Sequence, residues 1–122
     1  MLLKLTISNY ALIKEVTIDF SAGFTVITGE TGAGKSIILG AINILIGGRA
    51  SVKLLENKSR KSIIEGVFKS NQNLNKLLSN LDLDTSEDLI LRREIKPNGS
   101  SRSFINDSPV KVEQLKVISP HI

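Results

Sequence analysis

Eight consecutive residues near the start of the chain carry the clearest chemical pattern, Gly29-Glu30-Thr31-Gly32-Ala33-Gly34-Lys35-Ser36. They match the phosphate-binding pattern G-x-x-x-x-G-K-[ST] at every fixed position. Glycines let the backbone lie close to a phosphate chain, and successive N–H groups then form an anion nest at the start of a helix. Lys35 is expected to bridge the β- and γ-phosphates as the candidate catalytic residue, and Ser36 to offer its hydroxyl to Mg²⁺. The pattern predicts a nucleotide site.

The residues on either side of this motif predict the strand, loop and helix that it requires. Residues 24–28 are β-branched and aromatic, which suits a buried strand. Residues 36–46 are mainly apolar and contain no proline, so they predict a helix, and Gly47 and Gly48 supply its C-terminal stop.

Two further strands are expected before the motif. Leu3, Leu5 and Ile7 alternate with polar residues, and residues 15–20 alternate again after a connection at residues 9–12. Kinases and small GTPases usually place this loop after their first strand, whereas an antiparallel pair before it is typical of ABC-type ATPases. The comparison with ABC-type ATPases is an analogy based on the order of the elements.

The rest of the chain predicts more strands, helices and turns, and hence an α/β fold. The expected strands are residues 63–68, 89–95 and 102–106, separated or followed by turns at 96–99 and 106–109. Residues 71–81 carry leucines at helical spacing. A short amphipathic helix is expected near the end, with Val112, Leu115 and either Val117 or Ile118 on its apolar face.

Three charged groups have both a structural and a functional interpretation. The basic segment 49–61 is interpreted as a solvated loop, and the acidic residues between 82 and 88 as solvent-facing, because they lack metal-ligand spacing. Strand alternation places Arg92 and Arg93 on opposite faces, so both cannot serve one patch. With Arg102, they are interpreted as cross-strand charges on an exposed sheet face rather than as phosphate contacts.

Bulk properties exclude several classes of protein. The net charge of +4 permits nucleic-acid contact without requiring it, and the absence of cysteine excludes a disulfide framework. No signal-peptide pattern is present, and the apolar run 37–46 is about half of the ~20 residues that a membrane span needs. We expect a soluble protein of 122 residues that is one domain or part of one, because the chain stops without a closing pattern.

Several stretches resemble the start of the RecN family of bacterial DNA repair ATPases, which are related to the SMC proteins. They are residues 5–10, 18–20 and 23–36, and the later segments 47–50, 91–93 and 102–106 also match. Many SMC relatives carry Pro-Asn where this chain has Glu30-Thr31, so the loop resembles RecN in particular. The resemblance covers essentially the whole chain and is weakest between residues 52 and 88.

The resemblance implies that residues 1–122 form the N-terminal lobe of an ABC-type ATPase head that a long coiled coil divides. It implies ATP and Mg²⁺ at residues 29–36, DNA and a second head as partners, and the bacterial cytoplasm and nucleoid as location. A C-terminal lobe would supply the signature motif and the acidic pair that positions water, so this chain alone is expected to hydrolyse ATP poorly or not at all. Relatives often carry a basic residue near Glu56, so no contact role transfers to that position.

Two alternatives stay open. A stand-alone small P-loop kinase or GTPase would need a base-specificity motif such as Asn-Lys-x-Asp, and residues 57–60 lack its aspartate. A nucleotide-gated module without turnover would contact DNA or a partner head through the basic loop and the hairpin. Such a module would bind DNA with a steep salt dependence and no effect of ATP.

Overall fold

The computed structural model describes residues 2–20 and 32–122. In this part of the chain, six strands form one antiparallel sheet in the order β2-β1-β3-β4-β5-β6. The strands are β1 Leu2–Tyr10, β2 Ile13–Asp19, β3 Ser62–Lys69, β4 Asp88–Ile95, β5 Ser101–Ile105 and β6 Ser108–Val110. The helices are α1 Gly32–Leu45, α2 Gln72–Asn80 and α3 Val112–Ile118, with short 3-10 turns η1 Val52–Leu54 and η2 Ser119–His121.

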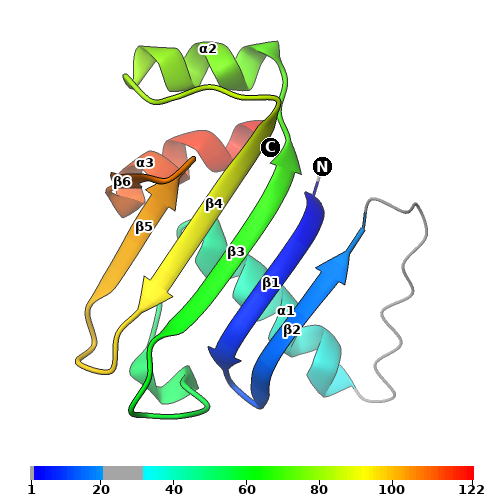
Figure 1. Cartoon of the computed structure of the whole chain (residues 1–122), viewed down its shortest axis with the longest axis vertical. Coiled ribbons are helices and arrows are strands. Elements are labelled where there is room, and N and C mark those ends of the chain that lie inside the picture. Colours follow the sequence, from blue (N-terminus) through cyan, green and yellow to red (C-terminus); the bar gives the residue numbers. More distant parts are fainter. Residues whose placement is uncertain (1, 21–31) are drawn as a thin grey trace.

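The helices lie in two places around the sheet. Figure 1 shows α1 and α3 behind one face of the sheet, while α2 lies at the end where β3 finishes and β4 begins. The expected α/β class is therefore confirmed, as are the two strands before the motif. The strand expected at residues 24–28 lies outside the described residues.

The first hairpin is tighter than the sequence predicted. The connection expected at residues 9–12 was wrong, because Asn9 and Tyr10 belong to β1 and Tyr10 pairs with Ile13. The turn itself contains only Ala11 and Leu12. Asn9 and Ala11 have φ values of 54° and 52°, and these left-handed residues close the hairpin in less chain than a regular loop needs.

The turn expected at residues 106–109 was also too long. Asn106 and Asp107, with φ of 47° and 67°, form the whole turn, and Ile105 pairs directly with Ser108. Two consecutive left-handed residues match the twist of a hairpin, so the chain resumes pairing at once as β6. Pro109 is tolerated there because β6 is an edge strand.

Most of the other described elements were predicted to within two residues, but α1 begins at Gly32 rather than at residue 36, because the second part of the motif is already helical. The side chain of Asn71 accepts a hydrogen bond from Leu74 N at 2.9 Å and caps α2, as its type suggested. On α3, Leu115 and Ile118 are buried and Val117 is exposed, which decides between the two alternatives for its apolar face.

The core lies between α1 and the sheet. Ala41, Ile44 and Leu45 of α1 are buried against a sheet face that includes Ile64 of β3. A Cβ added to Gly66, also in β3, would lie 2.5 Å from Leu45 Cδ2. Because glycine has no Cβ at that point, the last turn of α1 packs directly on the strand backbone.

Candidate phosphate-binding helix

Only part of the predicted phosphate-binding motif lies among the described residues. Gly29, Glu30 and Thr31 lie outside them. The remaining motif residues, Gly32, Ala33, Gly34, Lys35 and Ser36, form the start of α1. The side chains of Lys35 and Ser36 are both exposed.

This arrangement fits an anionic ligand. The first turn of α1 contains no acidic residue, and the unpaired N–H groups of a helix start carry partial positive charge. An exposed ammonium and an exposed hydroxyl follow at Lys35 and Ser36. A lysine and a serine in these positions are the groups that would hold a β/γ-phosphate and Mg²⁺.

At the C-terminal end of α1, the protein itself supplies hydrogen-bond donors to the last helix carbonyls. Gly47, with φ of 116°, donates its N–H to Ile44 O at 3.1 Å, and Gly48 donates to Asn43 O at 2.8 Å. This pair of bonds is a Schellman ending, and the left-handed conformation at Gly47 is one that other residues adopt with strain. The two glycines therefore end the helix as the sequence predicted.

Arg93 also holds this end of α1. Its side chain is 2% exposed, and Nη1 donates to Ile44 O at 2.6 Å and to Gly48 O at 3.1 Å. Burial lowers the pKa of the Arg93 guanidinium below its usual value. The prediction of an exposed cross-strand charge was wrong for Arg93, because α1 covers this face of β4.

Arg92 lies on the opposite face of β4, as the alternation predicted. Its guanidinium contacts Glu94 at 3.3 Å and Glu65 at 3.7 Å, and it lies 4.3 Å from the ring centre of Phe104. Arg92 therefore has the structural role expected of a cross-strand charge. Arg102 is exposed.

The basic segment 49–61 is anchored by one buried side chain. Its cationic residues are exposed, as predicted, but Asn9 Nδ2 donates to Asn57 O at 3.0 Å and to Arg60 O at 2.9 Å. Asn57 N donates back to Asn9 Oδ1 at 2.5 Å. Asn9 was not recognised from the sequence, where its only signal was a polar residue at an apolar position of the strand.

The acidic connection between α2 and β4 faces solvent. Asp82, Asp84 and Glu87 are exposed, in agreement with the prediction, and Glu87 Oε1 lies 3.8 Å from Lys69 Nζ. An exposed pair at this distance contributes little to stability.

Comparison with known proteins decides the family. A family model described as an AAA domain matches residues 4–119. The chain belongs to the AAA domain family. The resemblance of this AAA domain to RecN is confirmed by DNA repair protein RecN of Vibrio cholerae, which is 40% identical over 120 residues. The alignment covers 97% of this chain and 22% of that relative.

A second relative leads to the same conclusion. DNA repair protein RecN of Bacillus subtilis is 40% identical over 121 residues, covering 97% of this AAA domain and 21% of that protein. The chain thus spans about a fifth of the length of these relatives. Among the described residues, no helix combines the length and apolar character needed to cross a membrane.

Solved structures confirm the type of fold. A structure from a study of ATP-driven dimerization and DNA-stimulated activation of SMC ATPases superposes with a TM-score of 0.77 and 25% identity. The match covers 98% of this AAA domain and 77% of that chain. The predicted head fold of the ABC/SMC type is therefore confirmed.

Proposed function

We propose that this AAA domain, residues 1–122, is the ATP-binding N-terminal lobe of a RecN ATPase head that acts in DNA double-strand-break repair and recombination. The observation that carries the proposal is the complete phosphate-binding motif ending in exposed Lys35 and Ser36 at the start of α1. The names of the relatives support the repair role, and a bacterial cytoplasmic location at the nucleoid follows from it.

The proposed roles follow from residue chemistry. Residues 29–34 would surround the phosphates with backbone N–H groups, and Lys35 would place its charge between the β- and γ-phosphates. Ser36 would bind Mg²⁺, which neutralises the charge that develops on the transferred phosphoryl group. The other lobe would position water, and a second head would complete the site across a homodimer. DNA is the proposed partner of that longer protein.

The experiment that tests nucleotide binding is a calorimetric ATP titration of Lys35→Ala in a protein of the relatives' length. Loss of a charge-assisted contact of about 1.5–3 kcal/mol weakens binding by about 10- to 150-fold. Lys53→Ala is the matched control, because Lys53 is an exposed lysine of η1 outside the motif. Unchanged ATP affinity in Lys35→Ala contradicts the proposal.

A turnover assay separates the proposal from its two alternatives. The 122-residue chain is expected to hydrolyse ATP poorly, because the water-positioning groups lie in the other lobe. Steady turnover by this chain that persists in Lys35→Ala contradicts this expectation, and a preference for GTP favours a stand-alone GTPase. DNA binding that ATP does not affect favours a module without turnover.

A further inference from the structure

A cationic hollow lies at the C-terminal end of α1. It is a pocket of about 380 Å³ between that end of the helix, β5 and the start of α3. Among the described residues that line it, three are basic and none is acidic. The lining residues that matter here are Gly48, Arg49, Arg93, Ser101, Val112 and Lys116.

Arg93 is a buried charge without a carboxylate partner among the described residues. Its three contacts are the carbonyls of Ile44 and Gly48 and, at 3.4 Å, the hydroxyl of Ser101. Its Nε is buried and has no acceptor in the described part of the chain. Because buried charges are normally paired, the positive charge at this point is only partly compensated.

Two exposed cations add to this charge. Arg49 follows the helix ending, and Lys116 of α3 lies over it, since a Cβ added to Gly47 would lie 3.0 Å from Lys116 Cγ. Within the described ranges, none of the ion pairs includes Arg49 or Lys116. Both side chains therefore keep their hydrogen-bond donors for a ligand.

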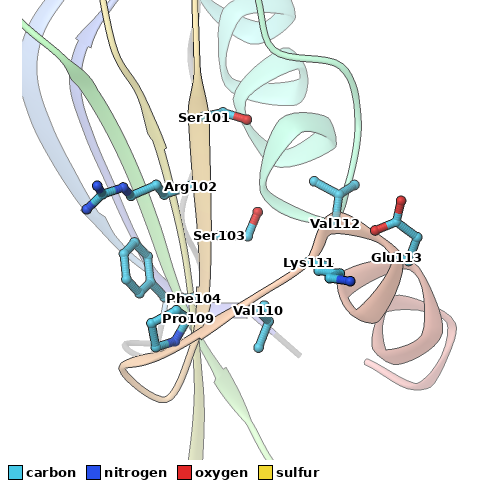
Figure 2. Close-up of a pocket in the computed structure, with 9 residues that line it drawn as sticks. All are labelled: Ser101, Arg102, Ser103, Phe104, Pro109, Val110, Lys111, Val112 and Glu113. Atoms are coloured by element: carbon cyan, nitrogen blue, oxygen red, sulfur yellow. The ribbon is translucent and has the colours of Figure 1, made fainter.

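The hydroxyl of Ser101 faces the same hollow. Figure 2 shows Ser101 and Ser103 pointing toward the side of the sheet on which α1 and α3 lie, whereas Arg102 and Phe104 point to the other side. Ser101 and Val112 line both this pocket and the neighbouring groove of about 540 Å³ along β5 and β6. A neutral donor thus lies beside the three cationic side chains.

We propose that this pocket binds a phosphate group through Arg49, Arg93, Lys116 and Ser101. Guanidinium and ammonium groups with a hydroxyl are the side chains that bind phosphate most effectively. The end of α1 opposes an anion with about half a negative charge. Three cations exceed that charge, and two carbonyls at this end already accept hydrogen bonds from Arg93.

The pocket is separate from the proposed nucleotide site. The 14 residues of α1 lie between them, which corresponds to about 21 Å of helix. One nucleotide bound at Lys35 therefore does not account for both the proposed nucleotide site and this pocket. The phosphate has two possible sources, a nucleic-acid backbone or a free phosphate. The inference is independent of the phosphate-binding motif, so Lys35→Ala is expected to leave this pocket unchanged.

The test uses Arg49→Gln combined with Lys116→Gln in this chain. Both side chains are exposed, so the fold is expected to be kept. The charge-matched control is Lys69→Gln combined with Lys76→Gln, two exposed lysines outside the pocket lining. The probes are a short DNA duplex, measured by fluorescence anisotropy across a salt series, and inorganic phosphate, followed through the NMR signals of the Gly48 and Ser101 amides.

Each outcome supports or overturns the proposal. For a nucleic-acid phosphate, the pocket variant weakens duplex binding and reduces the slope of log Kobs against log salt by about 2, whereas the control does not. For a free phosphate, inorganic phosphate shifts the Gly48 and Ser101 signals in the unmodified chain and the control but not in the pocket variant, while duplex binding is equal in all three. If the pocket variant and the control behave alike with both probes, the proposal is wrong. Normal pocket binding in Lys35→Ala separates this result from any failure at the nucleotide site.

Discussion

The two ends of α1 differ in what completes their backbone hydrogen bonds. At the C-terminal end, Gly47 and Gly48 donate to the carbonyls of Ile44 and Asn43, and the buried Arg93 guanidinium donates to Ile44 O and Gly48 O. At the other end, Lys35 and Ser36 are exposed and the first turn has no acidic residue to compensate its positive partial charge. The helix carbonyls at the C-terminal end are thus satisfied within the fold, whereas we propose that the exposed groups at the N-terminal end hold a nucleotide.

This difference is not visible in composition alone. Both ends contain glycines, and each has a basic residue nearby, Lys35 within the first turns and Arg49 after the last turn. Glycine before a helix permits close approach to a phosphate, whereas glycine after a helix permits the left-handed ending seen at Gly47. Under the proposed function, the order of glycine and lysine along the chain therefore distinguishes the nucleotide site from the helix ending, and the predictions below test this.

The largest effect on stability is expected at Arg93. Arg93→Met keeps the apolar stem but removes the hydrogen bonds from Nη1 to Ile44 O and Gly48 O. We expect the free energy of unfolding to fall by about 2–3 kcal/mol in urea denaturation, because hydrogen bonds to a charged group are lost from a buried site. Arg92→Met is the control and should cost less than about 1 kcal/mol, because its ion pairs are partly exposed. Equal losses in the two variants would remove the distinction between the faces of β4.

A smaller effect is expected where α1 rests on β3. Gly66→Ala places a methyl group against Leu45, which is fully buried, and overpacking of this kind should cost about 1–2 kcal/mol after the better strand propensity of alanine is included. The same substitution in a Leu45→Ala background should cost less, because the opposing Leu45 Cδ2 is gone and the tightest remaining contact is with Phe68 Cε1 at 3.0 Å. Urea denaturation of the unmodified chain, the two single variants and the double variant gives the coupling energy between Gly66 and Leu45. An equal cost of Gly66→Ala in both backgrounds contradicts the predicted contact.

Sequence reasoning succeeded where the pattern is local. The helix after the motif, the cap at Asn71 and the alternation on β1, β2 and β4 depend on neighbours within a few residues, and the structure confirms them. It failed at both short hairpins, because Asn9, Ala11 and Asn106 adopt left-handed conformations that residue type allows but does not require.

The role of Arg93 is beyond local pattern altogether. Alternation predicted the face of β4 on which it lies, but its acceptors are 49 and 45 residues away in the chain. Its burial depends on α1 covering that face, which only the fold determines. For the candidate nucleotide site, the sequence supplied every proposed ligand residue, and the structure adds the exposure of Lys35 and Ser36 within the described part of the motif.

The smallest expected effect on stability is at Lys35, and it tests the difference between the two ends of α1 most specifically, because here the substitution should raise stability rather than lower it. Lys35 places a positive charge near the positive end of α1, an arrangement that opposes folding by about 0.3–1 kcal/mol at low ionic strength. Lys35→Gln should therefore raise the free energy of unfolding by about 0.5 kcal/mol, with a gain that shrinks as salt is added, while it weakens ATP binding. Lys53→Gln lies outside α1 and should change neither quantity. A residue that lowers stability yet strengthens ligand binding is selected for function rather than for the fold. If Lys35→Gln instead lowers the free energy of unfolding, Lys35 has a structural role, like the contacts at the other end of the helix.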